Sequence, residues 1–168
     1  RKGLHGLRDG LAVANTPTAK ASSAALGLVE LAGRAVTAQP SIAPVTGRPS
    51  VWWDVAIHLW YEDGRNNGEW RQVAARHGGD IGVVEFVDDT GRIPVWLKGA
   101  DLLLEAQVWE SRKDALPSPG TRLLDELGFP WSGNQRIRVS ETCLEANGAV
   151  YVIGTLDERR NLPAPGDT

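Results

Sequence analysis

Hydrophobic and polar residues alternate with a period of two over several short stretches of the chain, which is the pattern of β-strands that bury one face. In residues 28–37, Val29 and Leu31 fall on one face and polar residues on the other. The longest stretch, residues 51–61, is rich in β-branched and aromatic residues, which favour strands. Its expected core face comprises Trp53, Val55, Ile57, Leu59 and Tyr61.

A hairpin is predicted after this long strand. Asn67-Gly68 is a strong hairpin dipeptide because both residue types tolerate positive φ. Residues 69–76 should therefore return antiparallel to residues 51–61, and the glycine-containing residues 78–80 should form the next turn.

A second hairpin is predicted from strands at residues 81–87 and 92–97, joined by a turn at residues 88–91. Pro94 has no N–H to donate, so its strand should lie at a sheet edge or beside a bulge. Residues 100–109 begin apolar and become alternating, and we expect a strand there rather than a helix.

The last third of the chain predicts one short helix and one further hairpin. Thr121 is a candidate helix N-cap, and Gly128 is a helix stop signal. The alternating residues 135–144 and 149–156 should pair as a closing hairpin through the turn at residues 145–148.

Several short strands with one or two short helices predict a mainly β fold. We expect an antiparallel β-barrel or sandwich, and an OB-like barrel is one form that it could take. The expected organisation is a basic connector of the juxtamembrane type at residues 1–25, a β domain at residues 26–160 and a Pro-rich tail at residues 161–168.

Composition narrows the class of protein. Of the 168 residues, 42% are hydrophobic and 23% charged, which is typical of a globular protein rather than a disordered one. The net charge of −3 argues against binding nucleic acid through a strong overall positive field. No apolar run reaches the roughly 18 residues of a membrane span, and no signal peptide is visible. Because Met is absent and the sequence begins with Arg1, we expect a domain excised from a longer protein.

Residues with catalytic potential are scattered. The sequence has no Gly-x-Ser-x-Gly motif, and the three histidines stand apart at His5, His58 and His77. The lone Cys143 permits neither an internal disulfide nor a cysteine-based zinc site, and a buried structural thiol is the expected role. We therefore expect no enzyme activity and no cofactor.

Asp88 and Asp89 offer the one weak metal-site pattern, because neighbouring carboxylates can hold a divalent cation. The alternative is an Asx turn, in which one carboxylate accepts backbone N–H bonds and Gly91 supplies conformational freedom. The position between two strands, without further carboxylates, favours the turn.

Seven tryptophans are more than a core of this size requires. An indole combines a large apolar face with a polar N–H, so exposed tryptophans could form a platform for a peptide, a glycan, a single-stranded nucleic acid or a membrane interface. For each one alone, core packing is the competing interpretation. The candidate binding residues are Trp52, Trp60, Trp70, Trp96 and His58.

Four stretches in a fixed order suggest a family. They are residues 15–35, which contain NTPTAK and GLVELAGRA, and residues 43–53, 86–91 and 138–154. Together they resemble the GIDE domain family, also called BAM for "beside a membrane", in a prokaryotic-type member similar to the membrane-proximal domain of mitochondrial RING-type E3 ubiquitin ligases.

The resemblance implies a membrane-associated soluble domain between flanking transmembrane helices outside this sequence, on an unknown face of the membrane. It implies a non-catalytic module for protein interaction or assembly, with an unknown protein partner. One alternative is an accessory part of an E3 ubiquitin ligase-like membrane protein, because the RING that carries E3 activity is a separate domain. The other is an OB-like binder of single-stranded nucleic acid or a small ligand.

Overall fold

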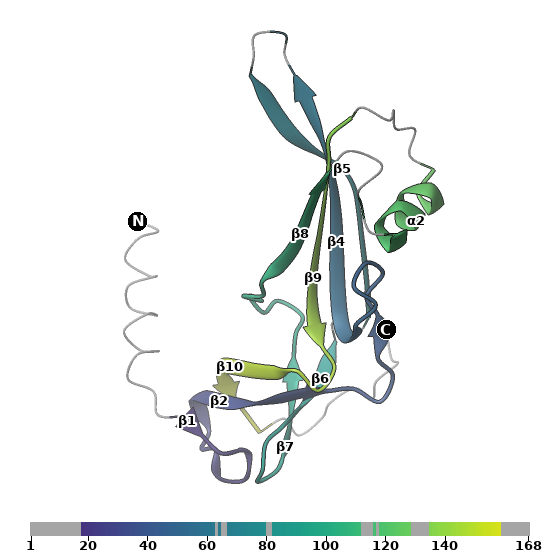
Figure 1. The fold of residues 1–168 in the computed structure, drawn as a ribbon. Coiled ribbons are helices and arrows are strands. Elements are labelled where there is room, and N and C mark those ends of the chain that lie inside the picture. Colours follow the sequence, from purple (N-terminus) through teal and green to yellow (C-terminus); the bar gives the residue numbers. More distant parts are fainter. Residues whose placement is uncertain are drawn as a thin grey trace. The chain divides into compact units, whose positions relative to one another are not determined.

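The computed structural model describes residues 18–62, 64, 67–79, 82–111, 116, 118–128 and 135–158. Within these residues the fold is mainly β, with one α-helix and one 3₁₀ helix (Figure 1). The strands form two curled, largely antiparallel sheets, so the predicted class of antiparallel β-barrel or sandwich with few helices is confirmed. The N-terminal 17 residues of the predicted connector and the Pro-rich tail lie outside the described residues.

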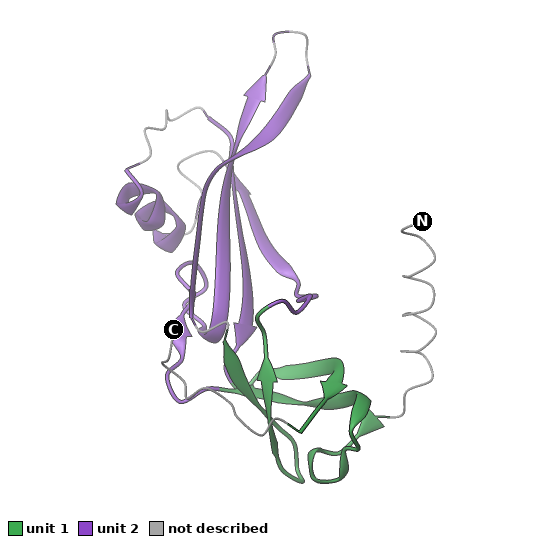
Figure 2. Cartoon of the chain, turned by 180° about the vertical axis from the view of Figure 1, so that it is seen from behind, with its two compact units in different colours: residues 1–36, 82–98, 147–168 green, residues 37–81, 99–146 purple. Residues whose placement is uncertain are grey.

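The chain divides into two compact units (Figure 2). The described part of the first unit is residues 18–36, 82–98 and 147–158. The second unit takes its described residues from 37–81 and 99–146. Each unit has its own five-stranded sheet and its own cluster of buried hydrophobic residues.

The first unit is organised around its longest strand, β2. Its elements are β1 (Thr18–Ala19), the 3₁₀ helix η1 (Ala21–Ser23), β2 (Gly27–Val36), β6 (Val83–Val87), β7 (Arg92–Trp96) and β10 (Ala149–Leu156). β2 pairs with β1 in parallel and with β10 and β6 antiparallel, and β6 pairs with β7 as the predicted hairpin. Pro94 lies in β7 at an edge of the described sheet, as its missing N–H predicts.

The core of the first unit is built from the face of β2 that the alternation predicts. Val29 and Leu31 are buried against Phe86 of β6, which is 1% exposed. Gly33 permits this packing, because a Cβ at that position would lie 2.5 Å from the Phe86 ring and 2.5 Å from the Val87 carbonyl oxygen.

The second unit has a sheet in the order β5, β4, β9, β8 (Figure 1). Its elements are β3 (Ser41–Ile42), β4 (Pro49–Glu62), β5 (Gly68–Gly79), β8 (Ala106–Ser111), α2 (Ser118–Glu126) and β9 (Ile137–Glu145). All of its pairings are antiparallel, and β3 pairs with the start of β4. The long strand and its antiparallel return are therefore confirmed.

One face of β4 supplies the centre of the second core. Trp53, Val55, Ile57 and Leu59 are buried as predicted. They pack with Ile137 and Val139 of β9 and with Leu123 and Leu124 of α2. Tyr61 is 38% exposed, because β4 extends past Leu59, the last residue that pairs with β9.

The predicted closing hairpin is wrong. β9 pairs with β4 and β8 in the second unit, whereas β10 pairs with β2 in the first. The residues between them do turn, and Asn147 has a φ of 62°. The backbone N–H groups of this turn, however, bond to strands other than its two neighbours. The Ala146 N–H donates to the Pro49 carbonyl at 2.9 Å, and the Asn147 N–H donates to the Ala35 carbonyl at 2.7 Å.

The predicted start of the helix is also wrong. α2 begins at Ser118, so Thr121 lies inside it, and the Thr121 hydroxyl donates to the Ser118 carbonyl at 2.8 Å. The stop at Gly128 is confirmed by its φ of 63° and by its N–H, which bonds the Asp125 carbonyl at 3.0 Å.

Three boundaries differ from the sequence pattern. Residues 100–105 are irregular, so the predicted strand begins only at Ala106. Gly78 and Gly79, expected in a turn, belong to β5, and Gly78 gives room to the Trp53 indole, which lies 2.4 Å from where a Cβ would be. Residues 18–25, expected in the connector, hold β1 and η1 and join the first unit.

Candidate functional site

The face of β4 that points away from the second core carries most of the predicted binding residues. Trp52, His58 and Trp60 alternate with the buried positions and are half-buried. Their cross-strand partners lie on β5 and β9, because directly paired residues of antiparallel strands share a face. Trp60 pairs with Trp70, and His58 pairs with Gln72 on one side and Arg138 on the other.

Two tryptophans and two arginines meet on this face. The Trp60 and Trp70 ring centroids lie 5.3 Å apart at an interplanar angle of 64°, an edge-to-face arrangement. The Arg136 guanidinium carbon is 5.0 Å from the Trp60 ring centroid and 5.4 Å from that of Trp70. The Arg138 guanidinium carbon lies 4.2 Å from the Trp70 ring centroid. These distances are those of cation–π contacts.

Glu110 of β8 completes the group, which we call the Trp–Arg cluster: Trp60, Trp70, Glu110, Arg136 and Arg138. The Glu110 carboxylate accepts hydrogen bonds from Arg138, at 2.9 Å, and from Arg136. The bond from Arg138, followed by that from Arg136, lowers the pKa of Glu110 from its ordinary value. Two guanidinium groups against one carboxylate leave the cluster with a surplus of one positive charge at neutral pH.

One buried polar atom of the cluster, Arg138 Nε, and one beside it, His58 Nδ1, make no hydrogen bond within the described residues. Their residues face each other directly across β4 and β9. A buried polar group without a partner costs about 1–3 kcal/mol. An ordered water satisfies many such groups, so the cluster is defined by its ring and guanidinium contacts rather than by these two atoms.

The predicted platform is therefore only partly assembled. Trp60, Trp70 and His58 lie together, while Trp52 is on the same face near the other end of β4, paired with Gly79 and Leu144. Trp96 belongs to β7 in the first unit.

The sequence pattern alone does not predict the charged half of the cluster. Arg136 and Arg138 occupy alternate positions just before and within β9, on the face that Ser140 and Thr142 continue. A run of polar residues at every second position of a predicted strand marks its uncovered face, and this signal could have pointed to both arginines.

Asp88 forms the Asx turn that the sequence favours over a metal site. Its carboxylate accepts the Thr90 N–H at 2.7 Å, the Thr90 hydroxyl at 2.7 Å, the Gly91 N–H at 3.0 Å and the Ala21 N–H at 2.8 Å. These bonds, the one from Ala21 first, hold the Asp88 pKa far below its ordinary value. Asp89 forms an ion pair with Lys20 at 2.5 Å. In the described part of the chain, no group of three or more His, Cys, Asp and Glu residues is placed to hold a metal ion.

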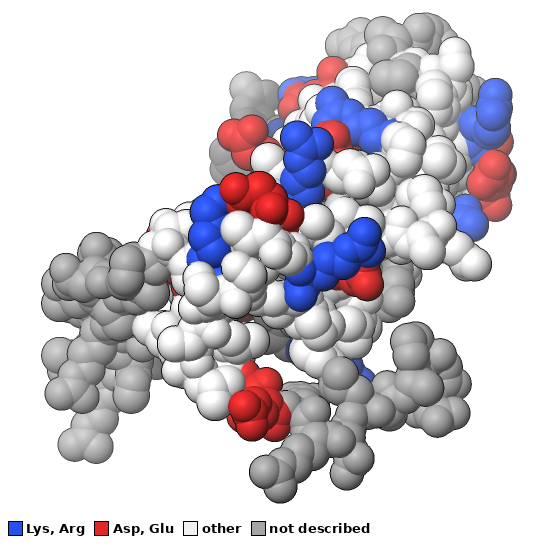
Figure 3. Space-filling view, turned by 90° about the horizontal axis from the view of Figure 1, so that it is seen from below, with Lys and Arg blue, Asp and Glu red and all other residues white. Residues whose placement is uncertain are grey.

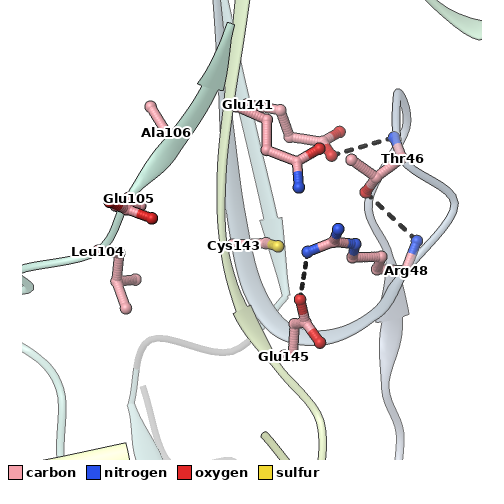
Figure 4. Close-up of a pocket in the computed structure, with 9 residues that line it drawn as sticks. Thr46, Arg48, Leu104, Glu105, Ala106, Glu141, Cys143 and Glu145 are labelled. Carbon is pink, nitrogen blue, oxygen red and sulfur yellow. Dashed lines mark hydrogen bonds and ion pairs between the residues drawn. The ribbon is translucent and has the colours of Figure 1, made fainter.

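A hollow of about 280 Å³ in the second unit is the other candidate (Figure 4). Glu141, 1% exposed, lies on one side, and its carboxylate accepts the Val45 N–H at 2.7 Å and the Thr46 N–H at 3.0 Å. Arg48 forms an ion pair with Glu145 beside it. Backbone N–H groups satisfy Glu141, and Glu145 pairs with Arg48, which is typical of groups with a structural role.

Cys143 also lines the hollow. It is half-buried in β9, less than the buried thiol that the sequence favours, and it packs against the second core. Burial, as the largest cause, raises the pKa of the Cys143 thiol. The thiolate that nucleophilic chemistry needs is therefore disfavoured at neutral pH.

Charges of both signs are interspersed on the face of the molecule drawn in Figure 3. On the face drawn in Figure 3, Lys and Arg side chains lie next to Asp and Glu side chains, without a broad region of one sign.

Among the helices of the described chain, none combines the length and apolar character needed to cross a membrane. Comparison with known proteins finds no matching family model, no matching curated protein and no matching solved structure.

Proposed function

We propose that this chain is a non-catalytic protein-interaction module that binds its partner through the Trp–Arg cluster. The observation that carries the proposal is the meeting of Trp60, Trp70, Arg136 and Arg138 on the sheet face opposite the core. Tryptophan and arginine are the residue types most enriched among those that dominate protein–protein binding energy. The half-buried rings form a rigid surface, so little side-chain entropy is lost when a partner docks.

The proposed partner is a protein rather than a nucleic acid. One surplus positive charge at the cluster is far from the concentrated basic surface that phosphate neutralisation needs, and the whole chain carries a net charge of −3. Binding of an oligonucleotide that weakens steeply with salt and is lost when the cluster is changed would overturn this part of the proposal.

We also propose a position beside a membrane, as an assembly module of a larger GIDE-like protein. The support is the ordered set of motifs at residues 15–35, 43–53, 86–91 and 138–154. The basic residues near the start of the sequence fit an anionic leaflet, where each Lys or Arg adds about 1 kcal/mol. A full-length gene without a transmembrane helix on either side of this domain would contradict the membrane position.

The test is affinity capture of the full-length protein from its own membrane fraction. We expect Trp60→Ala/Trp70→Ala to lower the recovery of a specific partner at least about tenfold, the size of effect expected for central aromatic residues of an interface. Trp96→Ala is the matched control, because it removes an indole from β7 of the first unit and leaves the cluster unchanged.

The Trp60 ring packs against Gly68, so its removal could disturb the β4–β5 pairing. Arg136→Ala therefore serves as a second variant, since this exposed side chain can be shortened without opening the core. Equal recovery of the partner by the wild type and by both cluster variants, each confirmed to be folded, would refute the proposal.

A further inference from the structure

Three of the four longer edge strands of the two sheets are protected. Within the described residues, the edge strands of five or more residues are β7 and β10 in the first sheet and β5 and β8 in the second, and the two-residue β1 and β3 also lie at edges. An unprotected edge offers unpaired N–H and C=O groups to any other strand, and soluble proteins normally block it.

Each of three edges carries a known kind of block. β7 contains Pro94, which has no N–H. β5 has an irregularity in its pairing with β4 at Ile57/His58 and carries the exposed Arg71 and Arg76. The short β8 carries Glu110, which is paired with arginines.

The fourth edge, β10, has no such block. Its sequence AVYVIGTL contains no charged residue and no proline over eight residues. β10 pairs along its whole length with β2, and no described strand lies on its other side. Two of its large hydrophobic side chains are exposed, Tyr151 by 56% and Ile153 by 39%. Leu28 of β2, diagonal to Ile153 and 50% exposed, adds to this apolar strip.

We propose that β10 pairs antiparallel with β10 of a second copy of this chain, so that the two first-unit sheets join into one. This proposal is independent of the function proposed for the Trp–Arg cluster. Two antiparallel copies of one strand are related by a two-fold axis, which places each residue opposite a residue of the same strand. Because β10 is uncharged, no register within it brings like charges together.

Charge complementarity at the ends of the strand favours one register and one direction. With Ile153 on the two-fold axis, Asp157 of one copy lies opposite Ala149 of the other. Ala149 is paired with the exposed Arg34 of β2, so Asp157 and the partner copy's Arg34 lie on one sheet face, two strands apart. A parallel pairing would instead bring the acidic Asp157 and Glu158 of the two copies together.

The first test is the mass of the chain in solution at micromolar to millimolar concentration, by sedimentation. We expect a monomer–dimer equilibrium, and we expect Ile153→Lys to raise its dissociation constant at least about tenfold, because it places two like charges opposite each other. Val108→Lys is the matched control, since Val108 is an aliphatic side chain 55% exposed on the β8 edge. A monomeric wild type at every concentration, or equal weakening by both substitutions, would overturn the proposal.

The second test fixes the register. In a Cys143→Ser background, Ile153→Cys should form an intermolecular disulfide with its own copy, because directly opposed antiparallel residues have Cα atoms about 4.5–5.5 Å apart. Tyr151→Cys should cross-link only when mixed with Thr155→Cys. Cross-linking with equal yield at all three positions, or at none, would contradict the assigned pairing.

The third test concerns the charged ends and the identity of the occupant. Asp157→Lys should weaken the dimer, and adding Arg34→Glu should restore it, because the swap re-forms the pair with opposite polarity. Failure of this rescue would contradict the register.

A monomer whose β10 amides are all protected from hydrogen exchange would show that other residues of the same chain cover the edge, and this would overturn the second copy as the occupant.

Discussion

At the scale of single residues, the buried carboxylate of Glu141 is the clearest determinant of stability. It accepts the backbone N–H groups of Val45 and Thr46, in a loop that supplies two buried core residues, Ala43 and Val45. An ionised acceptor for backbone donors is worth more than a neutral one. Glu141 therefore holds this loop against the sheet of the second unit.

We expect Glu141→Ala to lower the free energy of unfolding by about 2–4 kcal/mol, because it leaves two backbone donors without their acceptor. Glu141→Gln should cost less, since its amide oxygen can still accept. Urea denaturation measures both. Glu145→Ala is the control, because its ion pair with Arg48 is exposed and is expected to contribute less than about 1 kcal/mol. Equal losses at the two glutamates would refute the assignment.

Asp88 gives the first unit a pH dependence with a defined sign. Its pKa is lower in the folded chain than the ordinary value of about 3.9, so its contribution to stability is fully present above that value. The contribution is lost as the pH falls below about 4 toward the folded pKa. We expect Asp88→Asn to be less stable than the wild type at pH 7, with a difference that shrinks as the pH falls below 4. A difference that is constant from pH 7 to pH 2.5 in chemical denaturation would contradict this role.

At the scale of elements, the contact of β2 with Phe86 depends on a missing side chain. A Cβ on Gly33 would meet the ring and a backbone carbonyl, each at 2.5 Å, and the carbonyl has little freedom to move. The first core is thus fitted to a glycine in the middle of a strand, where glycine is otherwise unfavourable.

We expect Gly33→Ala to destabilise the chain by about 1–3 kcal/mol through overpacking. Gly154→Ala is a matched control in β10, the neighbouring strand, because no atom lies within 4 Å of its would-be Cβ. It should be neutral or slightly stabilising. Thermal unfolding of the two variants compares them directly, and similar melting temperatures would show that the Gly33 contact is not tight.

The elements also show what local sequence can and cannot predict. The alternation in β4 gave the core positions 53, 55, 57 and 59 correctly, because burial of one face imposes a period of two. The pairing of β9 with β10 was mispredicted, because residues 145–148 form a turn in either topology. The strand that accepts hydrogen bonds from a turn can lie far away in the sequence. A local sequence pattern therefore does not predict it.

At the scale of the whole molecule, the candidate site depends on this long-range pairing. Trp60 and Trp70 were predicted as binding residues from composition, and their meeting follows from the β4–β5 hairpin. The arginines lie just before and within β9, 66 or more positions away from Trp70. The sequence therefore predicted the aromatic half of the cluster, while the charged half required the sheet order.

The most direct test of the central claim is site-specific photo-cross-linking of the full-length protein in the cells that produce it. A photoreactive residue at Gln72, beside His58 on the open sheet face, should capture one defined protein partner. The same residue at Glu126, exposed on α2, is the control and should not. We predict that Arg136→Ala abolishes the cross-link from position 72. Cross-links of equal yield from positions 72 and 126, or a yield from position 72 that Arg136→Ala leaves unchanged, would contradict an interaction surface at the Trp–Arg cluster.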